Sequence, residues 1–114
     1  MAAQTSIERI ALSGSTNGRM IKVVATATAG TTIHTAHATA IDEIILVASN
    51  IDTVDRDLTV EHGGTSTSDQ LKITIPAKSI VELPPIQLTN SLLLKAFGSA
   101  TNIINIAGKV NRIT

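Results

Sequence analysis

The chain has 114 residues, nine basic and nine acidic side chains, one aromatic residue and no cysteine. This length supplies one domain with a modest core. The zero net charge and dispersed lysines argue against nucleic-acid binding, which needs clustered cations, and the lack of cysteine excludes disulfides and thiolate chemistry. Ile, Val and Thr account for 39 residues, and β-branched side chains favour strands.

The first segment, residues 1–19, has no sustained period. Ile7, Ile10 and Ala11 fit one amphipathic helical turn, but the polar run at residues 13–18 interrupts it. We interpret residues 1–19 as a flexible or partner-docked arm and residues 20–114 as the folded domain. We expect a soluble chain that its own sequence does not route for secretion, because it opens without the apolar stretch of a signal peptide. Its longest apolar run, residues 44–48, is far shorter than the roughly 20 residues of a membrane helix.

Alternating apolar and polar residues predict strands in the first half of the domain. Residues 20–28 alternate with a period of two, as a half-buried strand does. Residues 33–38 predict a second strand, with one face shared by Ile33, Thr35 and His37. Residues 44–48 are all apolar, which predicts a strand buried on both faces. Residues 50–57 form a polar turn.

The second half continues the pattern. The predicted strands are residues 58–61, 71–75, 80–83, 92–97 and 102–113, and the last should place Ile104, Ile106 and Val110 on one face. A hairpin loop at residues 63–68 and a turn at residues 89–91 separate them. Pro84 and Pro85 indicate a sheet edge or a crossing between sheets. About eight strands at this spacing predict an all-β, antiparallel β-sandwich or jelly roll.

The three histidines, His34, His37 and His62, are the only imidazoles. Zinc would need them to converge with a carboxylate, yet residues three apart on a strand point to opposite faces. We therefore interpret them as ordinary surface or interface histidines and predict no metal site.

Three acidic residues, Asp52, Asp55 and Asp57, form a sparse version of a calcium loop. An EF-hand has alternating oxygen ligands, a glycine at the sixth position and a glutamate at the twelfth, and this spacing does not match. We favour a turn in which the Asp side chains cap their own backbone, with calcium binding as the open alternative.

Catalytic signatures are absent from the sequence, including nucleophile elbows and phosphate-binding loops. The amides of residues 63–65 (Gly-Gly-Thr) could face an anion, but a glycine pair between strands typically forms a hairpin turn. Glu61 and His62 are neighbours on a strand and so point apart. We assign no catalytic, cofactor-binding or metal-binding residue and predict that the chain is not an enzyme. Phe97, the lone ring, is expected to anchor packing between sheets or subunits.

Four segments at turns and strand ends carry a family resemblance. They are residues 30–36, residues 58–65, residues 75–79 and the ending from Ala96-Phe97 through residues 108–113. Together they resemble small virion structural proteins encoded by tailed bacteriophages. The similarity covers about residues 30–113 and leaves the N-terminal arm unmatched.

The resemblance implies a compact β-sandwich that attaches to the virion, often as a homotrimer, after assembly in the host cytoplasm. The implied partners are copies of the chain and the major capsid protein or neighbouring virion proteins, with no nucleic acid, membrane or cofactor. In a trimer, we expect residues 92–94 and 103–104 to lie partly at subunit contacts, because their aliphatic side chains occupy both strand faces.

Capsid decoration, in which the protein acts as cement for the head lattice, is the expected function. A neck, tail-completion or tail-fibre-associated structural protein is the alternative with the same composition. A receptor- or glycan-binding module is less favoured, because sugar sites usually stack rings on Trp or Tyr, and the chain has neither.

Overall fold

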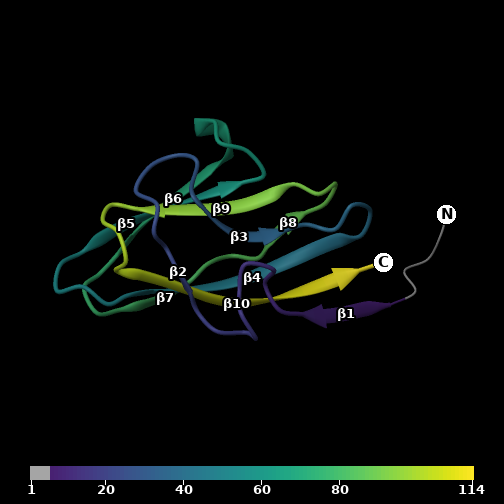
Figure 1. Ribbon diagram of the computed structural model, residues 1–114, viewed down its shortest axis with the longest axis horizontal. Coiled ribbons are helices and arrows are strands. Elements are labelled where there is room, and N and C mark those ends of the chain that lie inside the picture. The colour runs from purple at the N-terminus through teal and green to yellow at the C-terminus, as the bar shows by residue number, and fades with distance from the viewer. Residues whose placement is uncertain (1–5) are drawn as a thin grey trace.

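A computed structural model describes residues 6–114, which form two antiparallel sheets and no α-helix (Figure 1). Sheet A contains β1 (Ile7–Ile10), β2 (Ile21–Lys22), β4 (Ile41–Asn50), β7 (Ile80–Glu82), β8 (Ile86–Leu88) and β10 (Ile104–Ile113). Sheet B contains β3 (Thr31–Thr35), β5 (Arg56–His62), β6 (Gln70–Ile75) and β9 (Leu93–Gly98). One short 3-10 turn, η1 (Thr67–Asp69), precedes β6. The all-β prediction is confirmed, and the two sheets are compatible with a β-sandwich.

The strand pairings are nested around the hairpin of β5 and β6. Moving outward along the chain, β4 pairs with β7 and β8, β3 pairs with β9, and β1 and β2 pair with β10. Two further pairings complete the sheets, β4 with β10 and β5 with β9. The result is the order β1-β10-β4-β7 in sheet A and β3-β9-β5-β6 in sheet B.

One aliphatic core lies between the two sheets. Sheet A contributes Ile44, Leu46, Ala48, Ile104, Ile106 and Val110, and sheet B contributes Ile33, Leu58, Val60, Ile75, Leu94 and Ala96. The face predicted for Ile104, Ile106 and Val110 is therefore confirmed. In β4, however, Ile45 and Val47 are only partly buried on the outer face, so the prediction that residues 44–48 are buried on both faces is wrong. Alternation continues through this apolar run, as in an antiparallel sheet with one solvated face.

Two predicted strands differ from the structure in detail. Residues 20–28 form only the short β2, after which the chain crosses between sheets, with the amide of Val23 on the Ile104 carbonyl at 2.9 Å. In β3 the pairing register shifts between Thr32 and His34, so both Ile33 and His34 are buried while Thr35 is exposed. The face expected to be shared by Ile33, Thr35 and His37 does not form, because this irregularity breaks the alternation.

The N-terminal segment lies against the sheets over the part that the structure describes. Strand β1 pairs with β10, where Ile7 stands opposite Ile113. Leu12 is buried in the core. The amide of Gly14 donates to the carbonyl of Ile33 at 2.9 Å, and a Cβ at Gly14 would meet the Thr32 carbonyl oxygen at 2.6 Å. The structure thus differs from a flexible arm over residues 6–19, while residues 1–5 of that interpretation lie outside the described residues.

The proline pair lies at an edge of sheet A, so of the two predicted roles, a sheet edge or a crossing between sheets, the sheet edge is confirmed. Strands β7 and β8 flank Pro84 and Pro85 and pair with opposite ends of β4. The structure has ten strands where about eight were expected. The difference arises because β7 and β8 are two short segments along β4, and β1 and β2 are two short segments along β10. The hairpin loop between β5 and β6 and the turn at residues 89–91 are as predicted. Within the described range, no helix is long and apolar enough to cross a membrane.

Candidate functional site

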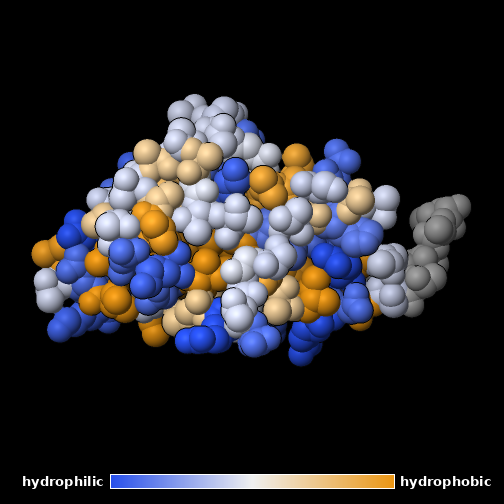
Figure 2. All heavy atoms as spheres, viewed as in Figure 1, coloured by the Kyte–Doolittle hydropathy of each residue, from blue (hydrophilic) through white to orange (hydrophobic). Residues whose placement is uncertain are grey.

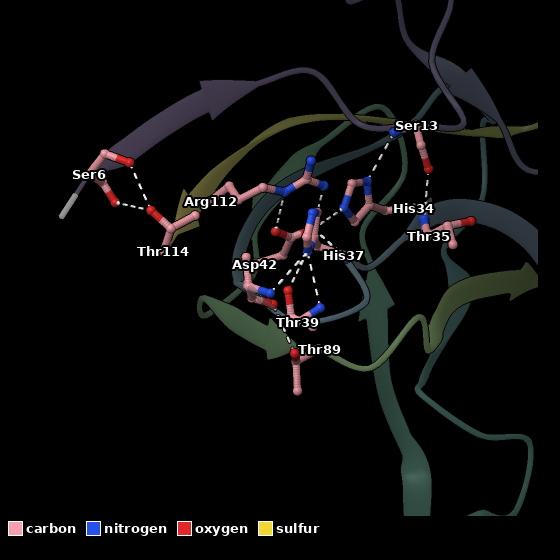
Figure 3. A network of polar contacts seen from close by, with 11 residues as sticks. Ser6, Ser13, His34, Thr35, His37, Thr39, Asp42, Thr89, Arg112 and Thr114 are labelled. Atoms are coloured by element: carbon pink, nitrogen blue, oxygen red, sulfur yellow. Dashed lines mark hydrogen bonds and ion pairs between the residues drawn. The ribbon is translucent and has the colours of Figure 1, made fainter. Parts of the chain in front are cut away.

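The most extensive buried polar cluster joins both sheets at Asp42 of β4 (Figure 3). Its side chain points toward His34 of β3 and Arg112 of β10. His34 Nε2 lies 2.7 Å from Asp42 Oδ2, while Arg112 Nε and Nη2 donate to Oδ1 and Oδ2 at 2.8 and 2.9 Å. Burial opposes ionisation of Asp42, but hydrogen bonds from Arg112 and His34 outweigh it and lower its pKa from 3.8 to about 2. The cluster holds a carboxylate with a bidentate cationic partner.

The tautomer of His34 follows from its neighbours. The amide of Ser13 donates to Nδ1 at 3.0 Å, so Nε2 carries the proton and donates to Asp42. The hydroxyl of Ser13 instead accepts a hydrogen bond from the Thr35 amide at 2.6 Å. Although Ser13, His34 and Asp42 are the residue types of a catalytic triad, the hydroxyl does not face the imidazole as such a triad needs. The geometry is that of a tie between the N-terminal segment and two strands.

The interpretation of His34 as a surface or interface histidine is therefore wrong: its side chain is 1% exposed. The register shift in β3 turns it inward. His37 Nδ1 accepts from the amides of Thr39 and Ala40, and His62 Nε2 lies 2.8 Å from the Gln87 carbonyl. The three imidazoles thus face separate partners, and residues 6–114 hold no group of three metal-ligating side chains.

A second buried carboxylate belongs to Glu61 of β5, which is 1% exposed. It accepts hydrogen bonds from the Gly30 amide at 2.6 Å and from the Thr28 hydroxyl. Val60 faces the core, so alternation places Glu61 on the outer face of sheet B. The loop through residues 28–30 therefore covers part of that face. His62 instead contacts the Gln87 carbonyl, so Glu61 and His62 point apart, as expected for neighbours on a strand.

The aspartate turn has no common centre. Asp52 accepts from Arg56 Nε at 2.8 Å and from the Thr53 amide at 2.7 Å. Asp55 accepts from the Ala77 amide, and Asp57 from the Thr74 hydroxyl. The carboxylates diverge instead of sharing a centre, which disfavours the calcium alternative. The predicted capping of the turn's own backbone is confirmed for Asp52, which binds the Thr53 amide. It is wrong for Asp55 and Asp57, whose partners lie 22 and 17 residues along the chain.

The hairpin loop borders a pocket of about 280 Å³ on sheet B, lined by Glu61, Gly63, Gly64, Thr65, Ser91, Leu92, Leu93 and Lys95. Gly63 has φ +83°, as expected in a tight turn. The carboxylate of Asp69 lies directly against Gly64 and accepts from the Ser66 hydroxyl at 2.9 Å. This negative charge disfavours the anion site considered for residues 63–65.

Aliphatic side chains reach solvent on the outer face of sheet A. Ile7, Ile113 and Ile41 stand directly opposite one another on β1, β10 and β4, and we call them the aliphatic row. Opposed residues of antiparallel strands share a face. Ile7 is 61% and Ile41 43% exposed. A hollow of about 340 Å³ lies further along β4 and β10, lined by Ile45, Leu46, Val47, Glu82, Leu83, Gly108 and Lys109.

Other exposed aliphatic side chains are dispersed. Figure 2 shows hydrophobic residues reaching the visible surface at several separate places between hydrophilic ones. Leu92 and Leu93 are partly exposed beside the hairpin pocket, whereas Leu94 and Ile104 are buried and Ile103 is intermediate. Of the segments expected at subunit contacts, only Leu92, Leu93 and Ile103 thus reach the surface. Phe97 is half-buried on the outer face of sheet B, so it does not anchor packing between the sheets.

Sequence reasoning missed the partners of Asp42 and Glu61. Arg112 is 70 residues from Asp42, and Gly30 is 31 residues from Glu61. For Asp42 the available signal was its position two residues before Ile44 on the inward face, where a charged side chain requires a partner. Glu61, on the outer face of sheet B, offered no such signal. No protein-family model, curated protein or solved structure matches the chain.

Proposed function

We propose that the chain is a bacteriophage virion structural protein that decorates the capsid and cements the head lattice. The observation that carries the proposal is the aliphatic row on sheet A, because exposed aliphatic groups on a regular sheet face favour contact with another protein surface. The neighbouring positions on the same face, Arg9, Asn111 and Glu43, supply the polar border of such a contact. The bacteriophage particle as the binding partner is inferred from the resemblance of the sequence to phage virion proteins.

The strand order supports a jelly-roll form of the sandwich as part of this proposal. Nested antiparallel pairs around one hairpin, rolled into two sheets, are what a jelly roll contains. The eight strands of that form correspond to the observed ten if β1 with β2 and β7 with β8 each count as one interrupted strand. Jelly rolls occur in viral capsids and in lectins, so the fold agrees with the proposal without excluding sugar binding.

The polar interior also fits a structural role. Asp42, His34 and Glu61 are buried and hydrogen-bonded to other parts of the chain. Across residues 6–114, every fully buried side-chain nitrogen or oxygen atom has a partner. These groups are committed to holding strands and loops together, and association of copies of the chain, as the trimer of the resemblance, would add burial to a core without aromatic rings.

Cryo-EM of the particle that carries this chain tests the proposal. Decoration predicts density for the chain distributed over the head lattice, with the outer face of sheet A toward the capsid protein. A single ring at the neck or tail would replace decoration with the alternative structural role. Density only at fibre tips, together with sugar binding by the purified chain, would contradict a structural role and favour the glycan-binding module.

A further inference from the structure

The edges of the two sheets differ in how well they are protected from pairing with other strands. In sheet A, β1 has four residues, and the opposite edge is interrupted between β7 and β8 by Pro84 and Pro85. In sheet B, β3 has an irregular register, and residues 13–14 bind its backbone through the amide of Thr35 and the carbonyl of Ile33. Short strands, prolines and bulges are devices that block edge-to-edge pairing.

Strand β6 is the exception. Its six residues pair with β5 in one uninterrupted register, and it has no partner on its other side among the described residues. Leu71, near its start, is 40% exposed. An open, regular edge is a template for another strand.

The free hydrogen-bonding groups of β6 can be assigned. Asp57 of β5 turns its backbone toward the end of β9, because its carbonyl accepts from the Ser99 amide at 2.9 Å and its amide donates to the Ser99 hydroxyl at 3.1 Å. Thr74, opposite Asp57, is therefore not hydrogen-bonded to it through the backbone. Its amide and carbonyl face outward, and alternation gives Lys72 the same orientation.

We propose that β6 pairs with β6 of a second copy of this chain, antiparallel about a two-fold axis at Ile73. In this register Lys72 of each copy stands opposite Thr74 of the other. Their outward amide and carbonyl groups then form the closely spaced hydrogen-bonded pair of an antiparallel ladder. Two four-stranded sheets become one continuous sheet, and no group outside the described chain is required.

The side chains select this register over its neighbour. Pairing about Ile73 sets Ile73 against its own copy and Leu71 against Ile75, so apolar side chains meet on the core face. A two-fold axis at Lys72 would keep the same faces but place two ammonium groups opposite each other, which is unfavourable. It would also use the amide of Gln70, which already donates to the Thr67 carbonyl.

Charge complementarity favours the same register. Thr74 donates its hydroxyl to the Asp57 carboxylate at 2.8 Å, and these two residues are opposed on the outer face of sheet B. When Lys72 of one copy lies beside Thr74 of the other, its flexible side chain reaches toward that Asp57. The two-fold axis creates this contact twice. An isologous interface requires such self-complementarity.

Sedimentation equilibrium of the purified full chain tests this pairing without any phage particle, so its outcome is independent of the proposed function. We expect an even-numbered species: a dimer, or a hexamer if the chain also trimerises. Lys72→Pro removes one outward amide, which an edge strand tolerates when that group does not serve its own ladder. It should raise the dissociation constant by at least about tenfold.

Lys72→Ala is the matched control, because it removes the same side chain and keeps the amide. It should weaken association less than Lys72→Pro does. Hydrogen exchange of the wild-type chain gives a second readout that does not depend on a variant folding: the amides of Lys72 and Thr74 should exchange slowly in the associated state and quickly on dilution. A monomer, an assembly of three copies only, or unprotected Lys72 and Thr74 amides in the associated state would overturn the pairing.

Discussion

The two buried carboxylates, Asp42 and Glu61, are held in different ways. Asp42 lies between the sheets and is paired with Arg112, and His34 donates to the same carboxylate. Glu61 lies on the outer face of sheet B and accepts from two uncharged donors, the Gly30 amide and the Thr28 hydroxyl. Asp42 thus joins strands of both sheets, whereas Glu61 fastens one loop to one sheet.

Because of this difference, we expect Asp42 to affect the stability of the whole fold and Glu61 to affect only the loop on the surface of sheet B. Removing one member of a buried charge pair leaves the other unpaired, which is costly. Loss of a carboxylate with neutral donors affects mainly the segment that those donors belong to. We therefore expect Asp42 to control global unfolding and Glu61 to control the local order of residues 28–30.

The largest expected effect is that of Asp42→Asn. The substitution keeps the shape of the side chain but leaves Arg112 without its counter-ion, and it should lower the free energy of unfolding by about 3 kcal/mol. Urea denaturation followed by circular dichroism measures this. Glu43→Gln is the matched control, because Glu43 is adjacent, faces outward and accepts only from Asn111 at 3.2 Å. Equal losses in the two variants would refute the central position of Asp42.

Acid should reproduce part of that loss. Because the pKa of Asp42 in the folded chain is about 2, below its ordinary 3.8, the ionised form stabilises the folded state above pH 3.8. This contribution, about 2 kcal/mol, is lost as pH falls through 3.8 toward 2. Urea titrations at several pH values in this window should show a steeper fall for the wild-type chain than for Asp42→Asn. Identical pH profiles would exclude Asp42 as the source.

A smaller and local effect is expected for Glu61→Gln. The amide group retains one acceptor but turns a donor toward the Thr28 hydroxyl or the Gly30 amide, so the free energy of unfolding should fall by about 1 kcal/mol. Hydrogen exchange at Gly30 should accelerate, while exchange in β10 stays slow. Uniform acceleration across both sheets would show that Glu61 supports the whole fold, as Asp42 does.

The smallest effect is expected for Asp52→Asn. The Asp52 carboxylate and Arg56 guanidinium lie 2.7 Å apart, but their side chains remain 23% and 30% exposed. Solvent-exposed ion pairs contribute little, so the free energy of unfolding should be indistinguishable from that of the wild-type chain in the same urea assay. A loss comparable to that of Asp42→Asn would mean that exposure does not distinguish the two pairs.

Strands with an unbroken alternation were predictable from sequence. Residues 102–113 place Ile104, Ile106 and Val110 on the core face as predicted, because these three residues are aliphatic, β-branched and an even number of positions apart. The strand at residues 7–10 was not, since its partner in β10 is about 100 residues away and its own pattern is too short to show a period. Pairing of this kind depends on the folded sheet and leaves no local signal.

The polar cluster was less predictable than the fold. Neither Asp42 nor Arg112 carries a motif, and their contact requires the exact register of β4 and β10, in which they are opposed. The interpretation of His34 as a surface or interface histidine failed because the register shift in β3 buries two successive residues, Ile33 and His34, and no sequence pattern marks that shift. By contrast, the capping of the turn backbone by Asp52 followed from residue chemistry alone, whereas the contacts of Asp55 and Asp57 with Ala77 and Thr74 depend on the pairing of β5 with β6.

The proposed binding function depends most directly on the aliphatic row. Particles assembled with the double variant Ile7→Lys and Ile41→Lys should carry much less of the chain than wild-type particles, as measured by quantitative mass spectrometry of purified virions. Ile51→Lys with Val54→Lys is the matched control, because it adds the same charge at exposed positions in the β4–β5 turn. We predict wild-type occupancy for that control and lost occupancy for the row variant. Equal occupancy of all three proteins, with each purified chain folded, would contradict the account.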